Sequence, residues 1–166
     1  MTVPRHHKEH APASVVVGII TISDTRVADT DDSGRVIREL LLRDRHELGY
    51  TAIVKDEAAA ILDAVTRAAE GCDAIVTNGG TGLGRRDVTI PTLAPHLGRV
   101  LPGFGEVFRS LSYAEIGSPA ILSGAIAGVF RGRLVFCLPG SPDACRLAME
   151  KLILPELGHA VGLLRR

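Results

Sequence analysis

The sequence predicts an α/β fold, a three-layer α/β/α sandwich built on one mostly parallel sheet with a single antiparallel strand. In the first half of the chain, apolar β-branched runs alternate three times with stretches of helical or loop character. Such alternation is typical of parallel strands joined by right-handed crossovers. In the second half, two apolar runs flank a short glycine-containing break at residues 131–133, which indicates a hairpin and therefore one antiparallel strand.

The first strand and helix are expected before residue 50. Residues 15–22, VVVGIITI, form a continuous apolar run that is typical of a strand covered on both faces. Apolar residues at three- and four-residue steps then predict an amphipathic helix over residues 35–48. Asp32 or Ser33 would cap its start, and Gly49 would end it.

Two further strands complete the first part of the predicted sheet. Residues 51–54 form a short strand, a helix follows from residue 57 to about residue 70, and residues 74–77 form the next strand. Ligands of open parallel sheets bind beyond the carboxyl ends of the strands. The residues that leave these strands are therefore expected to gather at one edge of the sheet: Ser23 and Asp24, Asp56, and residues 78–87.

The second half of the chain is expected to begin with a short helix over residues 89–97 and an extended segment at residues 99–101. A helix around Val107, Phe108 and Leu111 follows, and residues 119–123 form either a helical turn or a loop. After hairpin strands at residues 125–130 and 134–138, Ser141 caps a last helix. That helix runs to about residue 154, where Pro155 breaks or kinks it.

Composition and charge argue against several classes of function. The 166 residues are expected to form one domain over residues 14–166, preceded by a disordered leader at residues 1–13. The 19 basic and 19 acidic residues cancel and Trp is absent, which argues against binding to nucleic acid or to anionic membranes. No apolar run approaches the roughly 20 residues of a membrane helix, so a cytoplasmic location is expected.

Two groups of potential metal ligands carry only weak signals. The leader contains His6, His7 and His10, which could bind a metal but are more typical of a disordered segment. The cysteines lack the C-x-x-C spacing of zinc and redox sites and are expected to be reduced thiols: Cys72, Cys137 and Cys145.

Residues 77–87, TNGGTGLGRRD, follow the third strand and carry the strongest chemical signal in the chain. Closely spaced glycines allow positive φ angles and bring amide N–H groups up to a bound anion. Arg85 and Arg86 can pair with phosphate oxygens, whereas Asp87 would face a phosphate only with a cation between them. The loop therefore suggests a nucleotide with Mg²⁺. The alternative is a plain structural turn, because the spacing matches neither a P-loop nor G-x-G-x-x-G.

Several short motifs, in order along the chain, resemble one protein family: SDT, D-x-S-G, KDE, TNGGTGLGRRDVT, PGFGEVFRSLS, AILS and LPGSP. Their order and spacing are similar to those of the MoaB/MogA group of molybdenum cofactor biosynthesis proteins. The segment GEVFRSLSYAEIG is closer to the MoaB type than to the MogA type. The resemblance runs from Ser14 to about Leu157, and it implies the fold of that group.

The resemblance implies a molybdopterin adenylyltransferase, in which the terminal phosphate of molybdopterin attacks the α-phosphate of ATP and Mg²⁺ is required. The two catalytic aspartates of the family fall on Asp56 and Asp87, which would also hold the metal. Its nucleotide contacts fall on Ser23, Asp24, Gly79, Gly80, Thr81 and Gly82. Beside the resemblance, we expect Arg86 to help the amides of the glycine loop to bind the triphosphate. The molybdopterin-binding residues would be Pro139, Gly140, Ser141, Pro142, Ser123 and Glu106, and for Glu106 an ordinary surface role stays open.

Two positions depart from the family pattern. Asn78 stands where the family usually has Thr. Gly124 stands where relatives commonly have Arg, so that a positive contact is either missing or supplied by Arg131 or Arg133.

Two rival functions stay open beside adenylylation. One is a nucleotide pyrophosphatase related to the competence-damage proteins, and the other is a catalytically silent scaffold that carries molybdopterin to a partner. The resemblance also implies self-association as a trimer or hexamer, with molybdopterin synthase and the molybdenum insertase as further partners.

Overall fold

A computed structural model describes residues 11–166, and the leader histidines lie outside this part of the chain. Six strands form one sheet in the order β2-β1-β3-β6-β5-β4. All neighbours pair in parallel except β5, which runs antiparallel to both β6 and β4. The predicted sandwich with one antiparallel strand is therefore confirmed. The strands are β1 Val16–Ile22, β2 Glu47–Val54, β3 Ala74–Asn78, β4 Arg99–Val100, β5 Ile126–Phe130 and β6 Arg133–Leu138.

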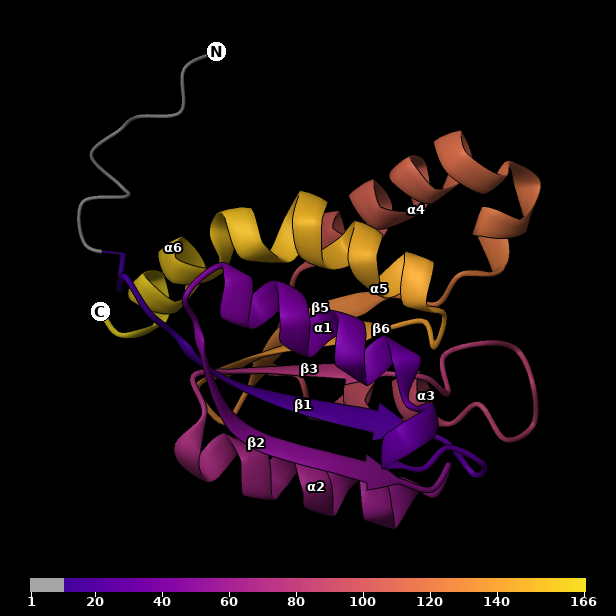
Figure 1. Cartoon of the computed structure of the whole chain (residues 1–166), viewed down its shortest axis with the longest axis horizontal. Coiled ribbons are helices and arrows are strands. Elements are labelled where there is room, and N and C mark those ends of the chain that lie inside the picture. Colours follow the sequence, from indigo (N-terminus) through magenta and orange to yellow (C-terminus); the bar gives the residue numbers. More distant parts are fainter. Residues whose placement is uncertain (1–10) are drawn as a thin grey trace.

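Helices cover both faces of this sheet (Figure 1). The α-helices are α1 Asp32–Arg43, α2 Ala58–Gly71, α3 Thr89–Leu93, α4 Pro102–Ile116, α5 Pro142–Ala148 and α6 Leu154–Leu164. A π-helical stretch, η5 Met149–Ile153, joins α5 to α6. Short 3₁₀ helices are η2 Ala28–Thr30, η3 Ala94–His96 and η4 Ser118–Leu122.

The sheet buries one apolar layer on each face. Residues of α1, α4, α5 and α6 pack on one face, and residues of α2 and α3 pack on the other. Along β1, Val17 and Ile19 join the first layer, whereas Ile20 and Ile22 join the second. Alternate residues of a strand point to opposite faces. Burial on both faces thus explains why β1 is apolar except at Thr21, close to its carboxyl end.

The first helix ends earlier than the sequence predicts, so the predicted boundary at residue 48 is wrong. Helix α1 ends at Arg43, and Arg45 adopts a positive φ of 65° before β2 begins at Glu47. Gly49 lies inside β2, where an added Cβ would come within 2.4 Å of Val16 Cγ1. Gly49 therefore allows close packing of β2 on β1 and does not end a helix. Parallel pairing with β1 overrides the helical periodicity of this segment.

The last helix continues beyond its predicted end. The π-helical stretch Met149–Ile153 comes directly before Pro155, and α6 then extends to Leu164. Proline lacks the N–H that continues an α-helical ladder, and a π-turn is one way to accommodate that loss. Leu157 and Val161 are buried in the core, which holds the extension in place.

The three cysteines of the chain are buried and unpaired. Burial raises the pKa of the Cys137 thiol to about 11 and that of Cys145 to about 12, so both stay protonated near neutral pH. Among residues 11–166, no helix has the length and apolar character needed to cross a bilayer.

The strand register sets the position of the loops that matter for function. Thr21 of β1 lies beside Asn78 of β3, which in turn lies beside Leu138 of β6. These three parallel strands therefore end at the same edge of the sheet. The loops that follow them start side by side there, as the sequence predicts.

Candidate active site

A cavity of about 600 Å³ lies at this edge of the sheet, between four segments of the chain. The glycine loop after β3 forms one wall, the loop after β6 forms another, residues 119–124 form a third, and Arg26 from the loop after β1 completes the lining. The cavity therefore brings together residues that the sequence assigns to the nucleotide and residues that it assigns to molybdopterin. The lining residues are Arg26, Gly79, Gly80, Thr81, Gly82, Asp87, Pro119, Leu122, Ser123, Gly124, Pro139 and Gly140.

The glycine loop can take its shape only because it lacks side chains at two positions. Gly79 and Gly80 have positive φ angles of 97° and 63°. A Cβ at Gly79 would lie 2.2 Å from the carbonyl oxygen of Ile22, and one at Gly80 would lie 2.6 Å from Oδ1 of Asp56. Thr89 fastens the loop: its Oγ1 donates to the Gly79 carbonyl oxygen at 2.8 Å, and its N–H donates to that of Gly80 at 2.9 Å.

The same loop contains backbone donors that no group in the described part of the chain uses. Gly80, Thr81 and Gly82 line the cavity, and their N–H groups donate to no acceptor within residues 11–166. Successive N–H groups in a glycine-rich turn form a concave site for an anion. The loop therefore has the donors that a phosphate group requires.

Asp56 and Asp87 both lie against this loop. Oδ1 of Asp56 sits beside Gly80, and Oδ2 of Asp87 accepts from the Gly84 N–H at 2.8 Å. Burial raises the pKa of Asp56, and the negative charges of Asp24 and Asp87 raise it further. The two carboxylates that the sequence pairs are thus close enough to repel each other.

A cation would relieve this repulsion, and the residues present fit Mg²⁺ in one particular way. Within residues 11–166, no group of three or more His, Cys, Asp or Glu side chains is placed to hold a metal ion. Mg²⁺ usually keeps several waters and binds one or two carboxylates together with substrate phosphates. Asp56 and Asp87 therefore suit an ion that is shared with the phosphates of a ligand.

Arg86, predicted to help bind the nucleotide, is paired with Asp24. Its Nε and Nη2 each donate to the Asp24 carboxylate at 2.9 Å. This hydrogen-bonded pairing lowers the pKa of Asp24 and raises that of Arg86. Asp24 also accepts from the Asp56 N–H at 3.3 Å, so it links Arg86 to the end of β2.

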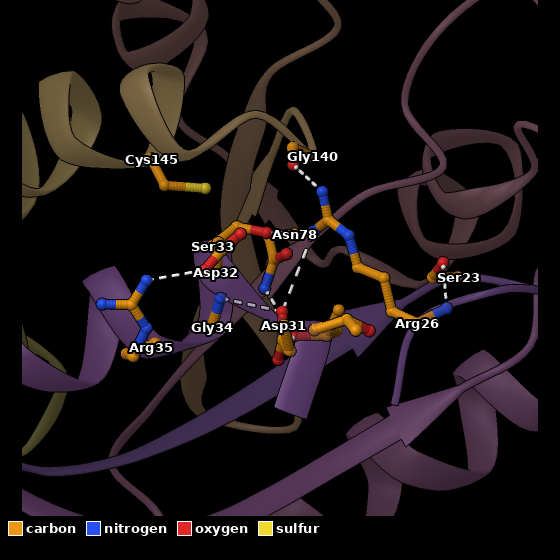
Figure 2. Close-up of polar contacts among 12 residues, drawn as sticks. Ser23, Arg26, Asp31, Asp32, Ser33, Gly34, Arg35, Asn78, Gly140 and Cys145 are labelled. Atoms are coloured by element: carbon orange, nitrogen blue, oxygen red, sulfur yellow. Dashed lines mark hydrogen bonds and ion pairs between the residues drawn. The ribbon is translucent and has the colours of Figure 1, made fainter. Parts of the chain in front are cut away.

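Arg26 is the charged cavity residue that sequence reasoning missed, and the lining residues Pro119 and Leu122 were missed as well. Its guanidinium donates through Nη2 to the carbonyl oxygen of Gly140 at 2.8 Å and through Nη1 to Oγ of Ser33. Figure 2 shows it between Gly140 and Asp31, and Nη1 lies 3.8 Å from Oδ1 of Asp31. The available signal was its place two residues after Asp24, in a loop already expected at the site.

A chain of hydrogen bonds from buried polar residues holds the Asp31 carboxylate in place. Asn78 Nδ2 donates to Thr21 Oγ1 at 3.0 Å, and Thr21 Oγ1 donates to Asp31 Oδ2 at 2.7 Å. Asp31 also caps α1 by accepting from the Gly34 N–H at 2.9 Å. The loop after β1 is thereby fixed to the ends of β1 and β3 and to the first turn of α1.

Comparison with known proteins establishes the family. Residues 18–159 match the family described as "Probable molybdopterin binding domain". The chain belongs to this family. Molybdenum cofactor biosynthesis protein B of Bacillus cereus is 49% identical over 163 residues, which cover 96% of each chain.

Solved structures agree with this assignment. A crystal structure of a molybdenum cofactor biosynthesis protein B superposes with a TM-score of 0.91 at 49% identity, covering 94% of this chain and 99% of that one. The tungsten cofactor synthesizing protein MoaB from Pyrococcus furiosus gives a TM-score of 0.86 at 39% identity, covering 94% and 100%. The MoaB/MogA resemblance is therefore confirmed, and the chain is a molybdopterin-binding domain of molybdenum cofactor biosynthesis.

Some residues predicted to bind molybdopterin lie outside the cavity of this molybdopterin-binding domain. Glu106 is exposed on α4, and it is not among the residues that line the cavity. Ser141 caps α5 by accepting from the Ala144 N–H at 3.2 Å, and Pro142 occupies the first turn of that helix. Ser23, which was predicted to contact the nucleotide, does not line the cavity either: it accepts from the Arg26 N–H at 3.1 Å and shapes the loop after β1.

Arg131 and Arg133 do not supply the positive contact expected beside Gly124, so that interpretation is wrong. Arg131 lies over the ring of Phe130, 5.2 Å from its centroid, and Arg133 is 3.5 Å from Asp73. Both lie near the start of β6, at the opposite end of the strand from Gly140. At Gly124 itself, an added Cβ would lie 2.0 Å from the Thr81 carbonyl oxygen. The molybdopterin-binding domain therefore has no room for a side chain there without a shift of the backbone.

Proposed function

We propose that the protein adenylylates molybdopterin with ATP in a Mg²⁺-dependent reaction, giving adenylyl-molybdopterin and pyrophosphate. One observation carries the proposal: the cavity is lined jointly by the glycine loop, by Asp87 and by the Pro139 and Gly140 loop. An anion-binding loop and a second loop from the neighbouring strand β6 can hold two phosphorylated substrates against each other. Family membership supports molybdopterin as one of them.

In this reaction the protein has to align the two phosphate groups and stabilise the negative charge on their oxygens. A phosphate oxygen of molybdopterin forms a bond to the α-phosphorus of ATP, and the bond between that phosphorus and the oxygen bridging to the β-phosphate breaks, so that pyrophosphate leaves with the electron pair. The attacking oxygen is already anionic, which removes the need for a side-chain nucleophile. The N–H groups of Gly80, Thr81 and Gly82 would hold phosphate oxygens in line.

Asp56 and Asp87 would hold the metal ion, directly or through water. A bound Mg²⁺ would supply positive charge to neutralise the triphosphate oxygens. We also propose that this protein is cytoplasmic and that it assembles as a trimer or hexamer.

Asp56→Asn and Asp87→Asn test the roles of the two carboxylates. Each variant is expected to lose about 100-fold or more in adenylylation rate, the scale found when one preorganised charge-stabilising group is removed. Asp63→Asn is the matched control, because Asp63 is exposed on α2 and pairs with Arg67. Wild-type rates in either site variant would refute the assignment.

Pyrophosphate release separates this reaction from its rivals. A transferase releases pyrophosphate from ATP only when molybdopterin is present. Release without molybdopterin would favour the pyrophosphatase. Tight binding of molybdopterin with no turnover of ATP would favour the silent scaffold.

A further inference from the structure

The cavity contains little positive charge, although its proposed substrates are anions. Among its twelve lining residues only Arg26 and Asp87 are charged at neutral pH. Asp87 would repel a phosphate unless a cation lies between them. Arg26 is therefore the only basic side chain among the lining residues.

Other arginines near the carboxyl edge are engaged elsewhere. Arg86 forms its two hydrogen bonds with Asp24, and it does not line the cavity. Arg35 pairs with Asp32 at 2.6 Å on the exposed side of α1. Arg85, like Arg86, lies in the glycine loop but does not line the cavity, so among the lining residues only Arg26 offers positive charge to a ligand.

The fold holds Arg26 in place without saturating it. Its side chain is 28% exposed, and it is fixed on one side by Gly140 and on the other by Ser33 and Asp31. A guanidinium has five N–H donors, and these contacts include two hydrogen bonds. Donors therefore remain for an anion in the cavity, and the planar fork suits a phosphate group.

The supporting contacts span the whole site. Asp31 is tied through Thr21 to Asn78 of β3, and Gly140 follows β6. A group bound to Arg26 would thus be positioned relative to the ends of β1, β3 and β6 together. We propose that Arg26 is the anion-binding side chain of the cavity, and that its guanidinium receives a phosphate group of a substrate between the glycine loop and Gly140. This inference rests on the proposed function and adds to it a residue that recognises a phosphate.

Equilibrium binding to three variants tests the inference. Arg26→Gln removes the charge but keeps a hydrogen-bonding side chain, and Arg26→Lys keeps the charge but loses the fork. Arg35→Gln is the matched control, because it removes a nearby charge that does not line the cavity. Calorimetric titration would use ATP with Mg²⁺, molybdopterin, and adenosine as a ligand without phosphate. Thermal unfolding of each variant would report on the fold.

Arg26→Gln is expected to weaken binding of ATP or of molybdopterin by about 10-fold or more, the range of a charge-assisted hydrogen bond. Whichever ligand loses affinity identifies the phosphate that Arg26 receives. Adenosine should bind Arg26→Gln as it binds wild type, Arg26→Lys should recover part of the loss, and Arg35→Gln should stay within about twofold of wild type.

Other outcomes would overturn the inference. If Arg26→Gln binds both phosphorylated ligands within twofold of wild type, Arg26 does not receive a phosphate. Equal losses for adenosine and for the phosphorylated ligands would assign Arg26 a purely structural role in holding the loops. If Arg26→Gln does not fold, the ligand affinities of Arg26→Lys decide by the same criteria. If the wild-type chain binds neither ATP with Mg²⁺ nor molybdopterin, the proposed function is refuted, and the inference with it.

Discussion

Arg86 binds Asp24 through a two-bond fork, with Nε and Nη2 each donating across 2.9 Å to the carboxylate. The pair joins the loop after β1 to the end of the glycine loop. Both charges act on Asp56: Asp24 raises its pKa and Arg86 lowers it. The pKa of Asp56 therefore depends on both members of the Arg86–Asp24 pair, whose charges act on it in opposite directions.

Asp24→Asn is expected to lower the pKa of Asp56. The substitution removes a negative charge that raises this pKa, and it leaves the opposing charge of Arg86 in place. Titration of the Asp56 carboxyl carbon by NMR measures the change. Asp63→Asn is the control and should leave Asp56 unaffected. An unchanged or higher pKa in Asp24→Asn would show that Asp24 does not act on Asp56.

Asp56→Asn is expected to be at least as stable as wild type at pH 7, although it loses activity. Burial and the nearby carboxylates raise the pKa of Asp56, so the folded state favours its protonated form. The stability linked to a raised pKa is present at low pH and is lost as the pH rises through the folded-state value. The neutral amide avoids that loss.

Denaturant unfolding of wild type and Asp56→Asn at several pH values checks the sign of this stability difference. The advantage of Asp56→Asn should shrink as the pH falls to about 4 and below, where the wild-type aspartate is protonated in both states. A variant clearly less stable than wild type at pH 7 would contradict the conclusion that burial and the nearby carboxylates disfavour the charged form of Asp56.

Gly80→Ala is expected to damage both the fold and the site. Gly80 has a φ of 63°, and an added Cβ would meet Thr89 Oγ1 at 2.4 Å and Asp56 Oδ1 at 2.6 Å. The backbone strain alone costs about 1–2 kcal/mol. The contact with Asp56 should add to that cost and should weaken binding of ATP with Mg²⁺.

Gly132→Ala separates backbone strain from contact. Gly132 has a φ of 78° with no atom within 4 Å of an added Cβ. Its substitution should therefore cost only the strain, about 1–2 kcal/mol, and should leave ligand binding unchanged. Equal losses of stability in the two variants, with equal ATP affinities, would show that Gly80 has no special role at the site.

Asp73→Asn is expected to lower stability by about 1–3 kcal/mol without affecting ligand binding. Asp73 accepts from Arg165 Nη2 at 2.7 Å and from the Val16 N–H at 3.1 Å, at the opposite end of the sheet from the cavity. Burial raises the pKa of Asp73, but the hydrogen bonds and the charges of Arg165 and Arg133 outweigh burial and lower it.

The pH dependence of Asp73 has the opposite sign to that of Asp56. A lowered pKa contributes stability that is present at neutral pH and is lost as the pH falls below about 4 and through the folded-state value. Unfolding of wild type and Asp73→Asn at pH 7 and pH 3 should therefore show a smaller difference at pH 3. A constant difference would mean that the charge of Asp73 does not stabilise the fold.

Much of the fold could be predicted because its signals are local. The runs that became β1, β3, β5 and β6 are apolar over consecutive residues, and those elements appear close to their predicted positions. The boundary between α1 and β2 failed because Leu48 satisfies a helical step and also pairs with Val17 in the sheet. A local pattern cannot choose between these two uses of one residue.

The candidate site was likewise predictable only in part. The glycine loop, Asp56 and Asp87 follow strands that had to end at one edge, so their proximity followed from topology. The same reasoning could have placed Arg26 at this edge, but it could not have revealed the hydrogen bond from Arg26 to Gly140, which is 114 residues away. The pairing of Arg86 with Asp24, across 62 residues, was equally hidden.

The sequence by itself therefore determined the layered architecture, the glycine loop and the carboxylates beside it, because each is encoded by residues near one another or by the order of strands. Only the tertiary structure decided which arginine faces the cavity, which one is held by Asp24, and which ones lie at the far end of β6. Long, flexible side chains take their partners from the loops that packing brings beside them, and nothing in their immediate sequence specifies those partners.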